Sequence, residues 1–332
     1  MSSSSQKFAI GIDIGATKIA SVLLSEDGEI IASSQVPTLA NEGMQAVLDK
    51  VVTEINTLRR LSSGELAGIG IGSPGQVDTA HGLVYDAINL GWTKVNLVQE
   101  ISRRIGTDLP IWVQKDTNLS TLGEQYFGAG RGCGDFLYVS IGSGLGGGII
   151  SGGHLITGGD WYAAELGHIS FDPDGLLCAC GNHGCAETIV SGSGLVRLTK
   201  RLLAENSNGS SPSNYDYLTP EDIISLAQNG DELALHALSE MGHALGVVMS
   251  ACVAILNPTR FIIGGGLGLA SFDFIVPAVH EEILQRTISN SRRVMNIVRS
   301  NIESPAIGSA CLVWYMLSGK KLKSSPVQKE VV

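Results

Sequence analysis

Four residues of the types that commonly bind zinc lie within eighteen positions of one another. Zinc prefers sulfur and nitrogen ligands, and three cysteines with one histidine close its coordination sphere without leaving a position for water. Glycines in the same segment allow the chain to wrap around an ion. We therefore predict a structural zinc site. Its ligands, in the spacing H-x9-C-x-C-x4-C, are His168, Cys178, Cys180 and Cys185.

Two other interpretations of this segment stay open. The cysteines could be buried together by coincidence, although free cysteines usually occur singly. His183 is a competing ligand, which we expect to point outwards. The remaining cysteines are predicted to be packing residues; they are Cys133, Cys252 and Cys311.

Two aspartates stand where apolar strands end. Asp13 follows the apolar run 8–12, and Asp116 comes after the run 111–113 and before a predicted helix over 119–127. A carboxylate at a strand end needs a partner, and for Asp13 a hydrated Mg²⁺ that bridges phosphates would be one. Phosphoryl transfer to an alcohol needs a base for the hydroxyl proton, and Asp116 could be that base. Alternatively, Asp13 caps its turn and Asp116 is a helix N-cap.

Glycine-containing turns follow strands in three places: 13–18, 142–147 and 264–267. Such turns bring backbone N–H groups close to an anion because no Cβ atom blocks the approach. None of them is a Walker A loop or a GxGxxG turn that opens a helix, so a Rossmann fold is disfavoured. Any one of them could be an ordinary hairpin, but three together favour a bound nucleoside triphosphate. The candidate contacts are Asp13, Gly15, Ala16, Thr17, Lys18, Gly142, Ser143, Gly144, Gly146, Gly265 and Gly266.

The elements that must position these residues form a repeated pattern. Strands are predicted over 8–12, 19–24 and 29–33, and a similar set recurs about 128 residues later over 136–141, 146–151 and 154–157. Helical periodicity covers 44–61, 191–203, 222–227, 233–256 and 306–317, and a surface loop is predicted over 205–214. A further buried strand is predicted over 261–263. Strands that alternate with helices in this way predict an α/β fold built by duplication.

Composition narrows the possible partners. The chain has 332 residues, 44% of them hydrophobic and 16% charged, which predicts a globular protein of two lobes. A net charge of −10 without a basic stripe argues against nucleic acid as a partner. The longest apolar run, 244–256, has 13 residues and is too short to cross a bilayer. The first residues, MSSSSQK, lack a signal-peptide core, so we expect a cytoplasmic protein.

The sequence resembles the ROK family (repressors, open reading frames and kinases) of the actin-like ATPase superfamily. GIDIGATK, which begins at Gly11, is similar to the family's first phosphate motif, SIGSGLGGG to the second, and GGGL to the adenosine motif. The run GH…CxCGxxGCxE, from Gly167 to Glu187, resembles the family signature. The resemblance covers about 10–266, most of the chain.

The resemblance implies a two-lobed ribonuclease H-like fold, with a duplicated mixed sheet and flanking helices, that binds ATP, Mg²⁺ and Zn²⁺. It implies a small lobe over 5–116 with the helix 306–318, and a large lobe over 117–305 with the zinc loop 165–187. The resemblance also implies that Asp116 is the general base of a sugar kinase. The predicted sugar contacts are Glu165, His168, Glu187, Lys115, Asn89 and Gly75. We expect a homodimer or homotetramer that binds neither nucleic acid nor membrane.

Three positions depart from the family pattern. Lys115 replaces the asparagine that many glucose-type members have before the aspartate, and a lysine can donate hydrogen bonds but not accept them. Trp161 and Ala164 stand where the family favours glycine. Trp161 could stack on a sugar face or narrow the pocket. Lys115 indicates either an acidic or unusual polyol as substrate, or a side chain outside the site. The sugar and its phosphorylated hydroxyl therefore stay open.

Two rival functions follow from the same resemblance. One is a sugar-sensing transcription regulator, whose helix-turn-helix domain of roughly 70–80 residues would precede the first phosphate motif. That motif starts at Gly11, so we expect no room for such a domain. The other is a non-catalytic sugar-binding relative that Lys115 has disabled.

Overall fold

The computed structural model describes residues 6–206, 218–289 and 296–319. The chain folds into two compact units. The first comprises Met1–Gly132, Gly148–Ala163 and Asn301–Val332, and the second comprises Cys133–Gly147 and Ala164–Ser300. The predicted surface loop 205–214 is wrong for residues 205 and 206, which end the helix α4 (Gly192–Asn206), and the rest of it lies outside the described residues.

The first unit is built on a five-stranded sheet with the order β3-β2-β1-β4-β8. The first three strands form the predicted antiparallel meander, whereas β4 and β8 run parallel to β1. Strand β1 is apolar nearly throughout and is buried on both faces, as expected of a central strand. The strands are β1 (Lys7–Ile14), β2 (Lys18–Ser25), β3 (Ile30–Pro37), β4 (Glu65–Ser73) and β8 (Ile111–Lys115).

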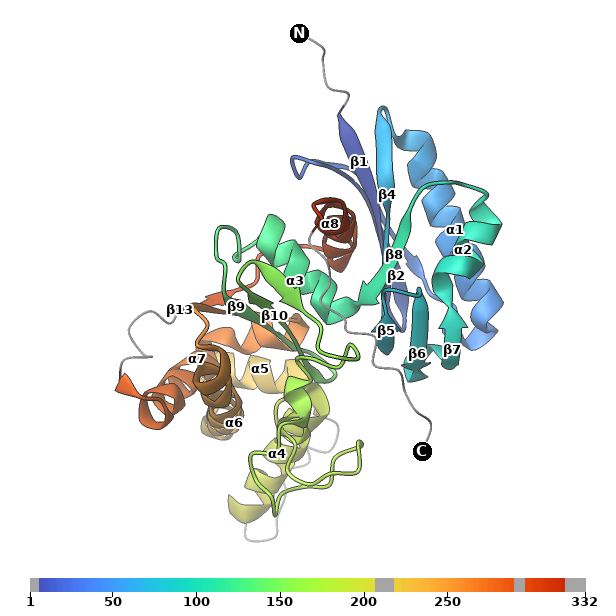
Figure 1. Ribbon diagram of the computed structural model, residues 1–332. Coiled ribbons are helices and arrows are strands. Elements are labelled where there is room, and N and C mark those ends of the chain that lie inside the picture. Colours follow the sequence, from blue (N-terminus) through green and yellow to red (C-terminus); the bar gives the residue numbers. More distant parts are fainter. Residues whose placement is uncertain (1–5, 207–217, 290–295, 320–332) are drawn as a thin grey trace, which may run out of the picture. The chain divides into compact units, whose positions relative to one another are not determined.

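Helices cover both faces of this sheet. Figure 1 shows α1 (Met44–Leu61) and α2 (Leu97–Ile105) on one face and α8 (Pro305–Leu317) on the other. The helix α3 (Asp116–Tyr126) packs on α8. The apolar residues of α1 recur at helical spacing and are buried against the sheet, which confirms the predicted helix 44–61.

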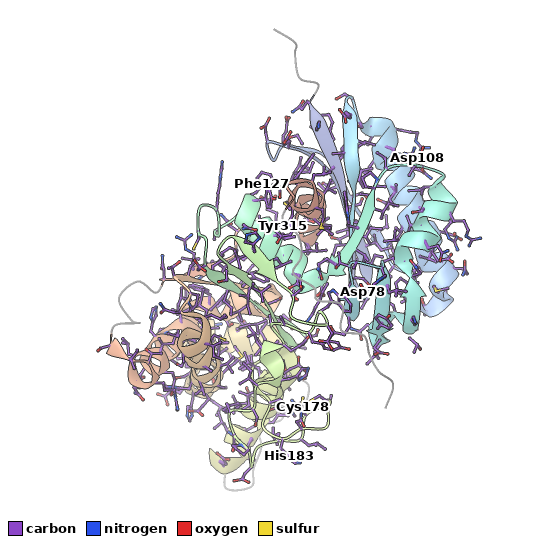
Figure 2. All side chains as sticks on the ribbon, viewed as in Figure 1. Asp78, Asp108, Phe127, Cys178, His183 and Tyr315 are labelled. Atoms are coloured by element: carbon purple, nitrogen blue, oxygen red, sulfur yellow. The ribbon has the colours of Figure 1, made fainter. Side chains whose placement is uncertain are left out.

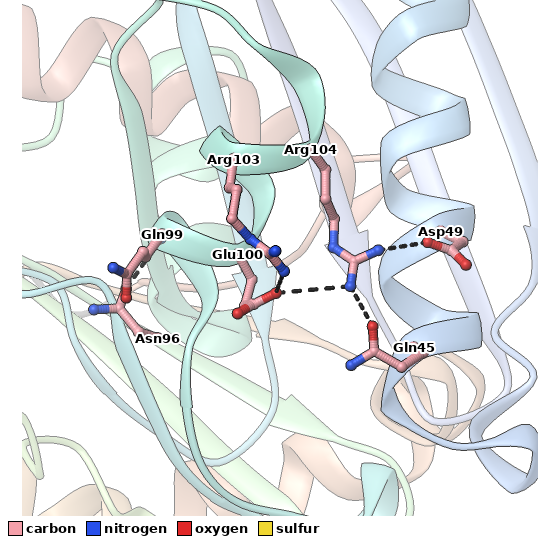
Figure 3. Close-up of polar contacts among 7 residues, drawn as sticks. All are labelled: Gln45, Asp49, Asn96, Gln99, Glu100, Arg103 and Arg104. Atoms are coloured by element: carbon pink, nitrogen blue, oxygen red, sulfur yellow. Dashed lines mark hydrogen bonds and ion pairs between the residues drawn. The ribbon is translucent and has the colours of Figure 1, made fainter.

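One arginine joins α1 to α2. Arg104 forms an ion pair with Asp49 of α1 (2.6 Å), lies 3.6 Å from Glu100 of its own helix, and donates to Gln45 (Figure 3). Asn96 begins α2 by accepting a hydrogen bond from Gln99 N at 3.0 Å. These contacts fix the two helices to each other at the outer side of the sheet.

The helix α8 lies unusually close to the sheet because the facing strand positions are glycines. A Cβ atom on Gly11 would overlap the carbonyl oxygen of Ala306, and one on Gly70 would overlap that of Ser309. Any larger residue at either strand position would push α8 away.

The first unit also contains a three-stranded antiparallel sheet with the order β5-β6-β7. The 3₁₀ turn η2 (Ile88–Leu90) connects its last two strands. Val77, Val84 and Val95 place the apolar side of this sheet in the core of the unit. The strands are β5 (Gln76–Asp78), β6 (Leu83–Ala87) and β7 (Trp92–Asn96).

The second five-stranded sheet has the order β11-β10-β9-β12-β13. It repeats the plan of the first, with an antiparallel pair, β10 and β11, followed by parallel strands β9, β12 and β13. The predicted duplicated α/β fold is therefore confirmed. The strands are β9 (Phe136–Ile141), β10 (Leu145–Ser151), β11 (His154–Ile156), β12 (Arg260–Gly264) and β13 (Asn296–Arg299).

Helices of the second unit pack around α6. Among the described helices, only α6 has the length and apolar composition of a membrane span, and 61% of its most apolar window is buried inside the protein. It contacts α4, α5 and α7, so it is a core helix of the unit. The helices are α4 (Gly192–Asn206), α5 (Pro220–Gln228), α6 (Glu232–Leu256) and α7 (Gly266–Arg286).

Candidate active site

Two carboxylates lie at one edge of the first sheet. The strands β1, β4 and β8 are parallel, and their register pairs Asp13 with Gly72 and Ser73 with Lys115. Because parallel strands end at the same edge, Asp13 and Asp116, which directly follows Lys115, are brought to one place. Residues more than a hundred positions apart in sequence thus become neighbours.

Asp13 has the features expected of a cation ligand. Its Oδ1 atom is buried and finds no hydrogen-bond partner among the described residues. The pKa of Asp13 is raised to about 7, chiefly by burial and also by the negative charge of Asp116, whereas Lys18 lowers it. A divalent cation would satisfy the buried oxygen and favour its ionised form, so the residue fits Mg²⁺. The turn that follows Asp13 is closed by a hydrogen bond from Gly15 N to Lys18 O (2.9 Å), so the Asp13 Oδ1 atom does not close it.

Asp116 is the first residue of α3, and Lys115 occupies the N-cap position. The Asp116 Oδ1 atom accepts a hydrogen bond from Thr117 N at 2.6 Å. The interpretation of Asp116 as the N-cap residue is therefore wrong, because the helix begins one residue earlier than that interpretation requires. Its carboxylate lies at the positive end of α3, where a negative charge is stabilised.

A buried polar network, which the sequence did not predict, supports the segment that carries Asp116. Gln114 is fully buried, donates to Thr79 Oγ1 (2.9 Å), and accepts from Asn118 Nδ2 (3.2 Å) and Lys115 N (2.7 Å). These bonds join β8, the start of α3 and the loop after β5. Glutamine and threonine lie 35 residues apart, so no local pattern could reveal the pair.

The first glycine turn is fixed on one side by hydrogen bonds and is exposed to solvent on the other. Thr38 donates through Oγ1 to Gly15 O (2.8 Å) and through its backbone N–H to Thr17 O (3.0 Å). Ala16, Thr17 and Lys18 are exposed on the other side. The turn therefore presents a polar and cationic surface with a fixed backbone, which suits binding of an anion.

The second sheet brings its own glycine turns together in the second unit. The strands β9 and β12 are parallel, with Gly264 paired with Ser140, so the turns after both strands share an edge. The turn after β9 closes through Gly142 N and Gly144 O (3.0 Å), and Ser143 is exposed. Gly146 lies within β10 and is half-buried.

The turn after β12 requires glycine. Gly265 has φ +78°, and a Cβ atom there would overlap the carbonyl oxygen of Ile141, whereas a Cβ atom on Gly266 would meet nothing within 4 Å. Gly265 is the N-cap of α7, and the N–H groups of a helix start attract phosphate. The geometry of this edge fits a nucleotide.

The four predicted zinc ligands lie together in the second unit. Their ligand atoms are all within 4.8 Å of one another, with Cys180 Sγ 3.6 Å from Cys185 Sγ and Cys178 Sγ 3.9 Å from His168 Nδ1. Zinc–sulfur bonds of ~2.3 Å place tetrahedral ligands about 3.8 Å apart, so the cluster fits the ion. The competing His183 instead contacts Gly175 O at 3.0 Å, and Figure 2 labels it beside Cys178 on this loop.

The predicted sugar contacts are divided between the units. Glu187, in the turn η4 (Ala186–Thr188), accepts a hydrogen bond from Leu145 N (2.9 Å) of the second glycine turn, a link that the sequence did not predict. Glu165 begins the turn η3 (Leu166–His168), and its carbonyl accepts from His168 N at 3.1 Å. These three residues lie in the second unit.

The other sugar candidates belong to the first unit, as do Lys115 and Asp116. Gly75 has φ +86° in the turn between β4 and β5, and Asn89 is exposed in η2. Trp161 and Ala164, where relatives favour glycine, have φ +70° and +65°. The backbone therefore keeps a left-handed conformation at both positions although the side chains are not glycine.

Comparisons with known proteins extend over nearly the whole chain. Residues 9–315 match the ROK family. A glucokinase from Halalkalibacterium halodurans is 32% identical over 282 residues, which are 82% of this chain and 84% of the relative. A xylose repressor from Caldicellulosiruptor bescii is 30% identical over 311 residues, which are 91% of this chain and 76% of that protein.

Solved structures agree with these matches. The crystal structure of a ROK family glucokinase from Streptomyces griseus, in complex with glucose and AMPPNP, has a TM-score of 0.74 to this chain. The identity is 31%, and the alignment covers 92% of this chain and 98% of that one. The residues 9–315 that match the family include the carboxylate edge, both sets of glycine turns and the cysteine–histidine cluster.

Proposed function

Because this chain belongs to the ROK family, we propose that it is an ATP-dependent kinase that phosphorylates a hydroxyl group of a hexose or hexose-like sugar. The observation that carries the proposal is that Asp13 and Asp116 lie at the same edge of the first sheet, where a buried oxygen of Asp13 lacks a hydrogen-bond partner. The glucokinases similar to this chain support the same chemistry.

The two carboxylates take different roles. Asp116 accepts the proton of the sugar hydroxyl as that oxygen attacks the γ-phosphorus of ATP. The Oδ1 atom of Asp13 is buried and lacks a hydrogen-bond partner, so in this proposal Asp13 faces the cation and Asp116 takes the proton. When bound, Mg²⁺ neutralises phosphate charge, and Asp13 would hold its hydration shell.

The second unit supplies the nucleotide site in this proposal. The glycine turn 142–144 and the start of α7 at Gly265 offer backbone N–H groups to the phosphates, and Thr17 and Lys18 of the first unit offer further contacts. Zinc, when bound to its four ligands, fixes the loop between Glu165 and Glu187. Those two glutamates and His168 then bind sugar hydroxyls, as do Lys115, Asn89 and Gly75.

An ADP-release assay over hexoses, amino sugars, ketoses and polyols tests the proposal. We expect ATP- and Mg²⁺-dependent release of ADP with at least one sugar and none with Asp116→Asn. If every sugar leaves ADP release at the background rate, although nucleotide and sugar both bind, the protein is not a kinase for those substrates.

That negative outcome would favour the second candidate, a non-catalytic sugar-binding regulator. The observation behind it is the 30% identity to the xylose repressor, over 91% of this chain. Both candidate functions include sugar binding, so only turnover of ATP to ADP distinguishes them. We further propose that the kinase works in the cytoplasm as a homodimer or homotetramer.

A further inference from the structure

The first unit contains a cavity of about 470 Å³ that the proposed phosphoryl transfer does not use. One wall is the β5–β6 hairpin, and the other is the short segment 159–162. That segment is a closed turn, because Ala163 N donates a hydrogen bond to Thr157 O at 3.2 Å. Cavities of roughly 300–1,000 Å³ hold small molecules, so the space is large enough for a ring-sized ligand.

The walls combine aromatic rings with carboxylates. Tyr85, Trp161 and Tyr162 line the cavity, and the exposed carboxylates of Asp86 and Asp160 lie among them. Aromatic faces pack against the apolar C–H face of a sugar ring, and carboxylates accept hydrogen bonds from its hydroxyl groups. The chemistry of the walls therefore fits a carbohydrate.

The charge of the lining disfavours an anionic ligand. No lysine or arginine is among the lining residues, all of which the structure describes. The imidazole of His81 is already held by Asp78, labelled in Figure 2, with 2.7 Å between Nδ1 and Oδ2. Lys94 lies over the ring of Tyr85, 5.5 Å from its centroid, but does not line the cavity. A neutral ring is the better fit.

Backbone strain marks the same cavity. Asp86 has φ +49° and Trp161 has φ +70°, and both residues line it. Such conformations are unfavourable for residues other than glycine and persist where the surrounding structure holds them, often at ligand sites. Glycine in either place would relieve the strain but remove the side chain that lines the cavity.

The cavity also adjoins the proposed sugar site along the chain. Gln76 of its lining directly follows Gly75, and Trp161 precedes Glu165 by four residues. We infer that the cavity is a second sugar subsite, which holds an uncharged ring attached to the ring that is phosphorylated. This inference rests on the proposed kinase function and assigns a disaccharide as its substrate class.

Binding and turnover of glucose, maltose and cellobiose test the inference. Calorimetry gives Kd, and ADP release gives kcat/KM. We expect at least one disaccharide to bind about tenfold more tightly than glucose, since one additional stacked ring contributes on that scale. Tyr85→Ala and Asp160→Asn should remove this advantage and change glucose turnover less than about twofold. Asp108→Asn, an exposed carboxylate of the same unit that does not line the cavity, is the matched control.

Each outcome is decisive. If glucose is phosphorylated but neither disaccharide binds more tightly than glucose, the subsite does not exist and the kinase proposal stands. Should the disaccharide advantage survive both substitutions in variants with wild-type melting temperatures, the second ring binds elsewhere and the inference is wrong. If no sugar is phosphorylated, calorimetry still tests the subsite, and only the proposed function fails.

Discussion

In the first sheet two of the three parallel strands end at carboxylates, whereas in the second sheet two of the three end at glycines. Both sheets have three sequential neighbouring strands followed by two further parallel strands. At the ends of β1 and β8 stand Asp13 and Asp116, and at the ends of β9 and β12 stand the turns at Gly142 and Gly265. The duplicated backbone thus provides two similar edges, and in the proposed function the carboxylates of one edge carry the acid–base chemistry and the glycine turns of the other bind the anion.

The largest expected effect is on the carboxylate edge. Asp116→Ala should lower kcat by about 10³-fold, within the range for a lost general base, and leave nucleotide affinity within about twofold. Asp108→Ala, an exposed carboxylate before β8, should change neither quantity. Near-wild-type turnover by Asp116→Ala would show that the base is another residue.

Zinc removal should lower the affinity for sugar more than the affinity for ATP. Chelation, or Cys180→Ser, should weaken sugar affinity by roughly 10- to 100-fold and ATP affinity by less, because in the proposed function the metal orders the segment that carries Glu165, His168 and Glu187. Cys133→Ser, outside the cluster, is the control. Metal analysis of protein purified without chelators should find one zinc per chain, and its absence would contradict the proposal.

Two adjacent glycines test the second edge. Gly265→Ala should lower the free energy of unfolding by about 1–3 kcal/mol and raise KM for ATP, because φ is +78° and a Cβ atom overlaps Ile141 O. Gly266→Ala should stay within about 0.5 kcal/mol, since its Cβ atom meets nothing within 4 Å. Equal destabilisation of the two variants would remove the steric argument.

Asp13→Asn should change how the free energy of unfolding depends on pH. The pKa of Asp13 is raised from 3.8 to about 7 in the folded chain. Protonated Asp13 therefore contributes its full share to the free energy of unfolding below pH 4, and this contribution is lost as pH rises through 7. Without Mg²⁺, the unfolding free energy of the wild type should fall relative to Asp13→Asn by about 3 kcal/mol between pH 5 and pH 8. Parallel stability profiles from chemical denaturation would contradict the burial of Asp13.

The smallest effect concerns specificity. Lys115 is the N-cap of α3 and directly precedes Asp116. If its ammonium group faces the sugar, Lys115→Asn should raise kcat/KM for glucose several-fold and lower it for the native substrate. An unchanged ranking over the sugar panel would exclude Lys115 from substrate selection.

The sequence predicted those parts of the site that depend on local patterns. The meander, the helix 44–61 and the cysteine–histidine cluster all follow from residue spacing, and the structure confirms them. The lobe boundaries, the role of Asp116 and the sugar contacts stay predictions.

Other features depend on contacts between distant segments and were not predictable. The strand β4 contains three alternating glycines and reads poorly as a strand, but one of them, Gly70, faces α8. The helix α7 begins at Gly266 and contains Pro277, which hides its periodicity. The network of Gln114, Thr79 and Asn118 joins residues that no local pattern connects.

The apolar core helix α6 has a consequence for synthesis of the chain. It is long and apolar enough to insert into a bilayer, and one of the helices that cover it, α7, ends at Arg286, thirty residues after Leu256. A ribosome adds about 5–20 residues per second, so α6 waits roughly 2–6 seconds for that cover. During this interval α4 and α5, already synthesised, are the only described helices of the second unit that can shield it. The order of elements along the chain thus places two of the helices that cover α6 before it and one after it.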